Sequence, residues 1–142
     1  MSDLQGYYFE DLQVGQTASY AKTVTEADIV LFAGISGDTN PVHLNEEFAS
    51  TTMFKGRIAH GMLSAGFIST VFGTKLPGPG CIYLAQNLKF KAPVKIGDTV
   101  VAKVEVTELV PEKKRASFKT TVTVGTTVVI DGDATLMVPS KG

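Results

Sequence analysis

A stretch of twelve residues without a charged side chain, 61–72, constrains the fold more than any other feature of this chain. The segment reads GMLSAGFISTVF, and Gly73 with the run PGPG at 77–80 predicts its end. A helix without a charged face is expected to be buried on nearly all sides. The chain has 142 residues, the length of one domain. The simplest arrangement is therefore a sheet wrapped around this helix, in a single domain over 1–142.

The rest of the chain supplies strands for such a sheet. Val and Thr are frequent after residue 98, and apolar and polar residues alternate there, as is typical of half-buried strands. Gly125 predicts a tight turn. We expect strands over about 17–24, 82–90, 99–110, 116–124 and within 126–139. The pattern favours an α+β fold with an antiparallel meander.

Two further helices are expected between the first strand and the uncharged segment. Thr25 and Asp28 have the spacing of a capping box, which predicts a helix over 26–36. Gly37 is expected to end that helix. A second, short helix is expected over 46–51. These two helices anchor both ends of the loop between them.

Asp38 and His43 lie five residues apart in that loop. Pro41 lacks a backbone donor, so 38–43 is not expected to form a regular helix. An acid and an imidazole held in one loop can grip a water molecule or a substrate proton, which suits general acid–base catalysis. The structural alternative is an Asx-type turn at Asp38 and a half-buried, hydrogen-bonded His43.

The start of the uncharged helix is a candidate site for a developing negative charge. The first amides of a helix lack internal partners and carry a partial positive charge. Gly61 would let a ligand oxygen approach that backbone. The alternative is that Gly61 is small for packing, and that His60 caps the helix or tethers a loop.

One face of this helix could line a narrow tunnel for an acyl chain. Residues three or four apart share a face, and this face holds Gly61, Ala65, Ser69 and Phe72. Ser69 could donate a hydrogen bond that orients Asp38. A stripe of small residues can equally mark close packing against a sheet. Ser64 lies off the stripe and is expected to hydrogen-bond back to its own helix.

Composition excludes several other functions. Thirteen basic and fourteen acidic residues leave no excess of positive charge, which binding to a nucleic acid backbone would require. One cysteine cannot form an internal disulfide, and with two histidines it cannot build a common Cys/His zinc site, which leaves only a carboxylate-rich metal site open. No apolar run reaches the roughly 18 residues of a membrane span, and no secretory signal is recognisable at the N-terminus. We therefore expect a soluble, cytoplasmic protein.

Isolated basic residues could still meet phosphates, although surface lysines are usually just solvated. The candidates are Lys55, Arg57, Lys89 and Lys91. Cys81 has no evident base beside it, which argues against a nucleophile.

Two motifs together make the chain recognisable. Asp38-Thr-Asn-Pro-Val-His43, followed by Ala59-His60-Gly61-Met62, resembles the hydratase motif of the MaoC-like dehydratases. The resemblance continues through Ile82-Tyr83-Leu84 with Gln86 and covers about residues 8–138. It is strongest to the stand-alone (R)-specific enoyl-CoA hydratases.

The resemblance implies a fold and a role for several residues. The family fold is the hot dog, an antiparallel sheet wrapped around a long helix, usually dimerised. Asp38 and His43 match the catalytic pair, and Gly61 matches the glycine whose amide faces the thioester oxygen. Ser69 matches a serine that supports the aspartate. Phe72 falls near the residue that limits acyl length, and Ala65 shares its face of the helix.

The implied reaction adds water to a trans-2-enoyl-CoA and gives an (R)-3-hydroxyacyl-CoA. It needs no metal or redox cofactor, because CoA is part of the substrate. A first alternative is the same chemistry on a chain bound to a carrier protein. A second is a non-catalytic acyl-CoA-binding hot-dog subunit, and a weaker third is a thioesterase.

Overall fold

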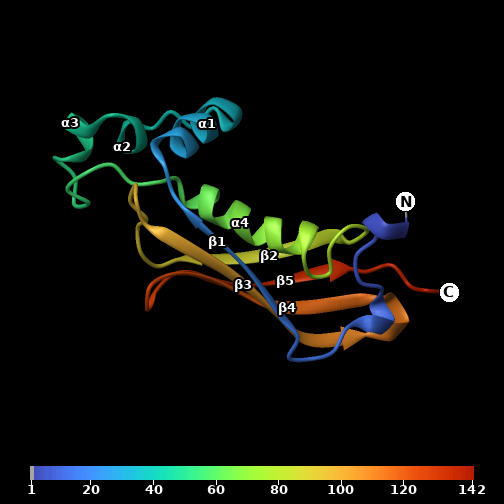
Figure 1. Ribbon diagram of the computed structural model, residues 1–142. Helices are drawn as coiled ribbons and strands as arrows, with labels where there is room; N and C mark the ends of the chain where they lie inside the picture. Colours follow the sequence, from blue (N-terminus) through green and yellow to red (C-terminus); the bar gives the residue numbers. More distant parts are fainter. Residues whose placement is uncertain (1) are drawn as a thin grey trace.

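The computed structural model describes residues 2–142 as a five-stranded antiparallel sheet with one long helix, α4, packed across it (Figure 1). The strand order is β1-β3-β4-β5-β2, so β1 and β2 form the edges. The strands span Thr17–Thr23 (β1), Ile82–Phe90 (β2), Thr99–Val110 (β3), Arg115–Val124 (β4) and Thr127–Met137 (β5). The helices span Glu26–Ser36 (α1), Pro41–Leu44 (α2), Glu46–Ala49 (α3) and Gly61–Thr74 (α4). The expected sheet and central helix are confirmed.

Alternation of side chains fixes which face of the sheet meets α4. In β3 the residues at 100, 102, 104 and 106 are fully buried, while their neighbours are exposed or half-buried. Phe118 on β4 belongs to the same core and packs edge-to-face on Phe72 of α4, with ring centroids 4.9 Å apart. The apolar side chains of α4 and of the sheet thus form one core.

Local signals set the bounds of α1 as expected. The Asp28 amide donates to Thr25 Oγ1 at 3.1 Å, and the Thr25 amide donates to Asp28 Oδ2 at 2.9 Å. Gly37 ends the helix at φ +79°, a conformation that glycine adopts without strain. The helices α1, α2 and α3 gather at one end of α4 (Figure 1).

Two expectations about helices were wrong. Pro41 does not prevent a helix but begins α2, because the first position of a helix needs no backbone donor. Asn40 caps that turn by accepting a hydrogen bond from the Val42 amide at 3.0 Å. The second expectation concerned Gly73, which was expected to end the long helix. Instead α4 continues through Gly73 to Thr74.

The expectation that α4 is buried on nearly all sides was also wrong. One side is buried and includes Phe67, Ile68 and Val71. The opposite side is exposed along a stripe that we call the open stripe: Met62, Gly66, Ser69 and Gly73. The sheet packs against only one side of the helix, so nothing among residues 2–142 covers this stripe.

Among the helices described within residues 2–142, none is long and apolar enough to cross a membrane.

Candidate active site

Asp38 lies in the loop between α1 and α2, and His43 lies on α2 rather than in the loop as expected; the loop is held by its own short hydrogen bonds. The Asp38 amide donates to Ser36 Oγ at 3.1 Å, and the Asn40 amide donates to Asp38 Oδ1 at 3.2 Å. The Asx-type turn considered from the sequence is therefore present. It uses one carboxylate oxygen of Asp38 and leaves the other for a ligand.

The buried ring of His43 has a defined tautomer. Its Nδ1 lies 2.8 Å from the carbonyl oxygen of Ile58. A carbonyl oxygen can only accept, so Nδ1 carries the hydrogen, and Nε2 of the neutral ring is left with a lone pair. His43 thus presents an acceptor nitrogen, as a base or a water ligand requires.

The fold brings the acid and the imidazole together. A carboxylate oxygen of Asp38 and one ring nitrogen from each of His43 and His60 all lie within 4.8 Å of one another. A water molecule that donates two hydrogen bonds of about 2.8 Å holds its acceptors roughly 4.6 Å apart. The spacing therefore suits one water molecule held between Asp38 and His43.

The same three side chains have the composition of a metal site with two histidines and a carboxylate. However, the rings of His43 and His60 are stacked, with centroids 3.8 Å apart and planes inclined by only 27°. An imidazole binds a metal in the plane of its ring, at about 2.0–2.1 Å for zinc. One metal ion cannot lie at that distance in both of two nearly parallel ring planes stacked 3.8 Å apart, so this geometry does not fit a metal held by both histidines.

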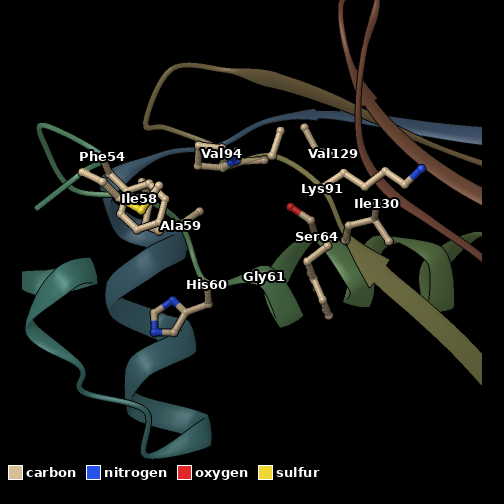
Figure 2. A pocket seen from close by; sticks show the side chains of 14 residues that line it. Phe54, Ile58, Ala59, His60, Gly61, Ser64, Lys91, Val94, Val129 and Ile130 are labelled. Carbon is tan, nitrogen blue, oxygen red and sulfur yellow. The ribbon is translucent and has the colours of Figure 1, made fainter.

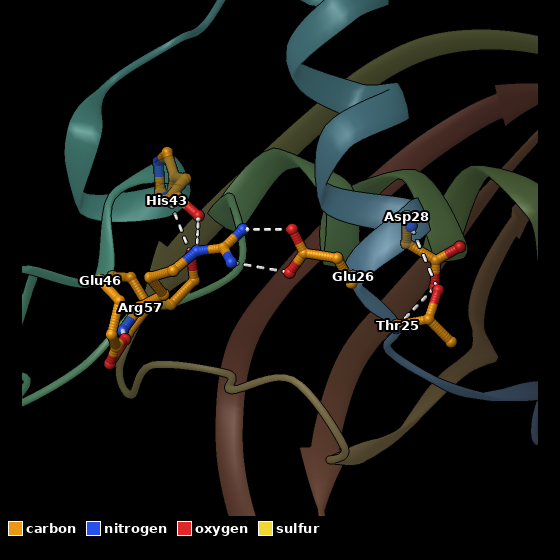
Figure 3. Close-up of polar contacts among 7 residues, drawn as sticks. Thr25, Glu26, Asp28, His43, Glu46 and Arg57 are labelled. Atoms are coloured by element: carbon orange, nitrogen blue, oxygen red, sulfur yellow. Dashed lines mark hydrogen bonds and ion pairs between the residues drawn. The ribbon is translucent and has the colours of Figure 1, made fainter.

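Arg57 ties this loop to the rest of the site (Figure 3). Its Nε donates to the carbonyl oxygen of His43 at 2.6 Å. Its guanidinium makes a bidentate pair with Glu26 of α1, at 2.7 and 3.0 Å. Of the basic residues considered for phosphate binding, Arg57 is thus engaged inside the protein, joining α1 to α2.

Arg57→Lys is expected to lower kcat by about three- to tenfold and the free energy of unfolding by about 1–2 kcal/mol. A lysine ammonium cannot keep both the pair with Glu26 and the bond to His43. Thermal denaturation and steady-state kinetics measure the two effects. Glu26→Gln is the matched control and should cost less, because it leaves the bond to His43. Unchanged kcat and stability in Arg57→Lys would contradict this role.

Gly61 opens α4 and lines a cavity of about 440 Å³ (Figure 2). The cavity lies between the segment 53–60, the start of α4 and the segment 90–94. A Cβ on Gly61 would lie 2.8 Å from a ring carbon of Phe90, so the position admits no larger residue unless that ring moves. The free amides of the first turn of α4 are at this end of the helix.

Ser64 lies in the same cavity, and its predicted bond to its own helix is wrong. Its Oγ is buried and has no hydrogen-bond partner among the described residues. Figure 2 shows this hydroxyl directed into the cavity. It is a polar atom that the folded protomer leaves unsatisfied.

The predicted acyl stripe does not lie in one cavity of the protomer. Ala65 and Ser69 line a separate groove of about 430 Å³, between α4 and the edge strand β2. No hydrogen bond from Ser69 to Asp38 is present among residues 2–142. Phe72 is buried in the core and packs against Tyr83, which lines the groove, so Phe72 lies behind the groove wall.

Tyr83 and Gln86 form the wall of that groove on β2. Tyr83 packs edge-to-face on Phe72, with centroids 5.3 Å apart. Burial raises the pKa of Tyr83 to about 12, so the phenol keeps its proton and donates to Gln86 Oε1. Gln86 Nε2 donates in turn to the buried Thr120 Oγ1 at 3.0 Å. A continuous chain of hydrogen bonds therefore links this wall to the buried Thr120.

Two residues matter more in the structure than the sequence suggested. His60 contacts both members of the acid–imidazole pair, although residue types alone left it as a cap or tether. It does not cap α4 through its side chain, and it does tether the loop. Arg57 carries no local pattern that would have paired it with Glu26, 31 residues away.

Burial raises the pKa of the Cys81 thiol, in agreement with an inert cysteine.

Known proteins are similar to this chain in sequence and in fold. Residues 11–131 match a family model described as a MaoC like domain. An (R)-specific enoyl-CoA hydratase from Rhodospirillum rubrum is 70% identical over 112 residues, which cover 79% of this chain and 78% of the relative. A 3-hydroxybutyryl-CoA dehydratase from Methylorubrum extorquens is 55% identical over 116 residues, with 82% and 74% covered. The unliganded R-hydratase of Pseudomonas aeruginosa has a TM-score of 0.91 at 47% identity, with 97% and 89% covered.

Proposed function

Because this chain belongs to the MaoC-like family and has the hot-dog fold, we propose that it is an (R)-specific enoyl-CoA hydratase. It adds water reversibly to a trans-2-enoyl-CoA and gives an (R)-3-hydroxyacyl-CoA. The observation that carries the proposal is the convergence of Asp38 and His43 within 4.8 Å, in the motif that resembles the family's catalytic pair.

In the proposed reaction, Asp38 and His43 hold the attacking water between them. The water O–H bond breaks as the oxygen bonds to C3 of the enoyl chain. The proton reaches C2 through the pair, because the free carboxylate oxygen of Asp38 and Nε2 of His43 both accept. The product keeps the thioester, and no electron is gained or lost. We therefore expect no cofactor beyond the CoA of the substrate, and no metal.

Negative charge builds on the thioester oxygen in the enolate-like transition state. The amide of Gly61 is proposed to stabilise this charge with the positive end of α4 behind it. In other enzymes, the loss of one such donor costs about 2.7–4 kcal/mol of transition-state stabilisation.

The acyl chain is proposed to lie in the groove lined by Ala65 and Ser69, with Phe72 behind its wall. This groove opens along the open stripe of α4 and the edge strand β2. On β2 the side chains of Ile82 and Leu84 are 53% and 41% exposed. A second copy of the chain would cover these apolar groups and pair the free strand edge, so we propose a homodimer.

Gly66→Glu is expected to convert the dimer to a monomer. Gly66 lies on the open stripe, and a Cβ there would meet no atom within 4 Å among residues 2–142 apart from its chain neighbours and the backbone of α4, so we expect the fold to tolerate the charge and a second copy to oppose it. Sedimentation velocity measures the change. Thr107→Glu, an exposed position on β3, is the control and should remain dimeric. If Gly66→Glu remains a dimer, the interface lies elsewhere. If the natural protein is a monomer, the proposed dimer is wrong.

The proposed activity is tested by hydration of enoyl-CoAs of graded chain length, followed by the absorbance of the conjugated thioester. The 3-hydroxyacyl product should have the R configuration. Crotonyl thioesters of CoA and of a carrier protein are compared side by side. Faster turnover of the carrier form would favour a carrier-protein dehydratase, and binding without hydration would favour a non-catalytic subunit. Release of free CoA would indicate a thioesterase.

The proposal extends to the organisation and location of the protein. One continuous cluster of buried apolar residues supports a single domain. The small net charge of -1 supports a small-molecule substrate over a nucleic acid. A cytoplasmic location follows from the proposed substrate, since acyl-CoA thioesters are intracellular metabolites.

A further inference from the structure

The side chain of His60 contacts the loop residue Asp38 and His43 of α2, and its backbone precedes the helix that begins at Gly61. Its backbone is the N-cap of α4, but its side chain makes no capping hydrogen bond. The ring is 2% exposed. His60 is among the residues that line the cavity, and Figure 2 shows its ring directed away from the Ser64 hydroxyl. It is therefore a buried ring directed at the loop.

The contacts of this ring reach both members of the proposed catalytic pair. His60 Nε2 lies 2.9 Å from the main-chain carbonyl oxygen of Asp38. The ring stacks on that of His43, with centroids 3.8 Å apart and an interplanar angle of 27°. Phe32 of α1 packs against it at a centroid distance of 4.8 Å. One side chain thus contacts both the main chain of Asp38 and the ring of His43.

The hydrogen bonds of His60 separate a positioning role from a proton-transfer role. Its partner is a carbonyl oxygen, so Nε2 is the donor and Nδ1 holds the lone pair of the neutral ring. This Nδ1 is buried and has no partner among the described residues. A buried acceptor without a donor costs free energy, and a phenyl ring of similar shape would avoid that cost. The contribution that an imidazole makes here and a phenyl ring could not is therefore the hydrogen bond donated by Nε2.

We propose that His60 is a positioning residue that sets Asp38 and His43 relative to each other and to the Gly61 amide. This inference rests on the proposed hydratase function. Its Nε2 is engaged with the main-chain carbonyl oxygen of Asp38, so we assign His60 no direct step in the reaction. It acts by holding the reacting groups in register, where a displacement of about 1 Å can cost roughly a hundredfold in rate.

Three substitutions separate the two contacts of the ring. His60→Phe keeps a flat ring for stacking but loses the Nε2 donor. His60→Gln places an amide nitrogen near the position of Nε2 but loses the stack. His60→Asn is its matched control, because the shorter amide reaches only the position of Nδ1. Each variant is assayed with crotonyl-CoA for kcat, KM and the pH profile, and by thermal denaturation for folding.

A positioning role predicts that His60→Phe and His60→Asn lower kcat by roughly ten- to a hundredfold. KM should change by less than about threefold, because the substrate groove is not touched. His60→Gln should retain more of kcat than His60→Asn. All three should fold, and the pH profile should keep its shape because His60 carries no proton in the reaction.

Several results would overturn this inference. The first is a kcat for His60→Phe within about threefold of the natural protein. The second is equal kcat for His60→Gln and His60→Asn, and the third is failure of all three variants to fold. If the natural protein hydrates enoyl-CoAs and Asp38→Asn abolishes that activity, a fully active His60→Phe overturns only the role of His60. If the natural protein hydrates no enoyl-CoA, the proposed function fails, and this inference fails with it.

Discussion

Replacing Asp38 by Asn, or His43 by Gln, is expected to lower kcat for enoyl-CoA hydration by at least about a hundredfold while leaving the fold intact. The Asn side chain can still accept the hydrogen bond from the Asn40 amide, so the turn survives. Arg57 binds the main-chain carbonyl of His43, which does not change with the side chain. What is lost in each variant is a basic group that can take up the proton of the attacking water.

Steady-state hydration of crotonyl-CoA measures the effect, and circular dichroism confirms that each variant is folded. Because the two groups hold one water together, the double variant should be about as impaired as either single variant. Glu47→Gln removes an exposed carboxylate from the neighbouring α3 and serves as the control with unchanged kcat. Near-natural rates in either single variant would refute the catalytic assignment.

The second large effect is expected at Phe72. This ring is 1% exposed and packs edge-to-face on Phe118 and Tyr83. Phe72→Ala is expected to lower the free energy of unfolding by about 3–5 kcal/mol, because it leaves a cavity in the core. Urea denaturation measures this loss. A loss of less than about 1 kcal/mol would mean that the ring is not part of the packed core.

A milder change at Phe72 tests its link to acyl length. Tyr83 stands between Phe72 and the groove, so Phe72→Leu should let the phenol retreat and deepen the groove. The chain-length profile of enoyl-CoA hydration is expected to shift toward longer chains. Phe118→Leu removes similar volume from the same core without touching Tyr83 and is the control. An unchanged profile in Phe72→Leu would separate this residue from substrate selection.

Much of the fold could be predicted because its signals are local. The capping box of Thr25 and Asp28 and the glycine at 37 act within one or two turns, and α1 has the predicted bounds. Alternation in 99–110 likewise depends only on neighbouring residues, and β3 has these bounds. The prediction was wrong at Pro41, where a rule against proline inside helices was applied to a helix's first position.

The candidate site was predictable in part. Asp38 and His43 stand only five residues apart in the chain, so their proximity could be expected from the sequence. The stripe 61, 65, 69 and 72 follows helical spacing correctly, but spacing along a helix does not reveal what packs against each residue. In the structure these residues are divided between a cavity, a groove and the core.

The sequence by itself therefore determined the fold class, the helix at its centre and the acid–imidazole pair, because periodicity, capping and a short loop act over a few residues. Only the tertiary structure decided what surrounds that pair. It stacked His60 on His43 and joined Arg57 to Glu26. It also left the open stripe of α4 uncovered beside a free strand edge. These contacts join segments 17 to 31 residues apart, and chain packing, not local pattern, sets their geometry.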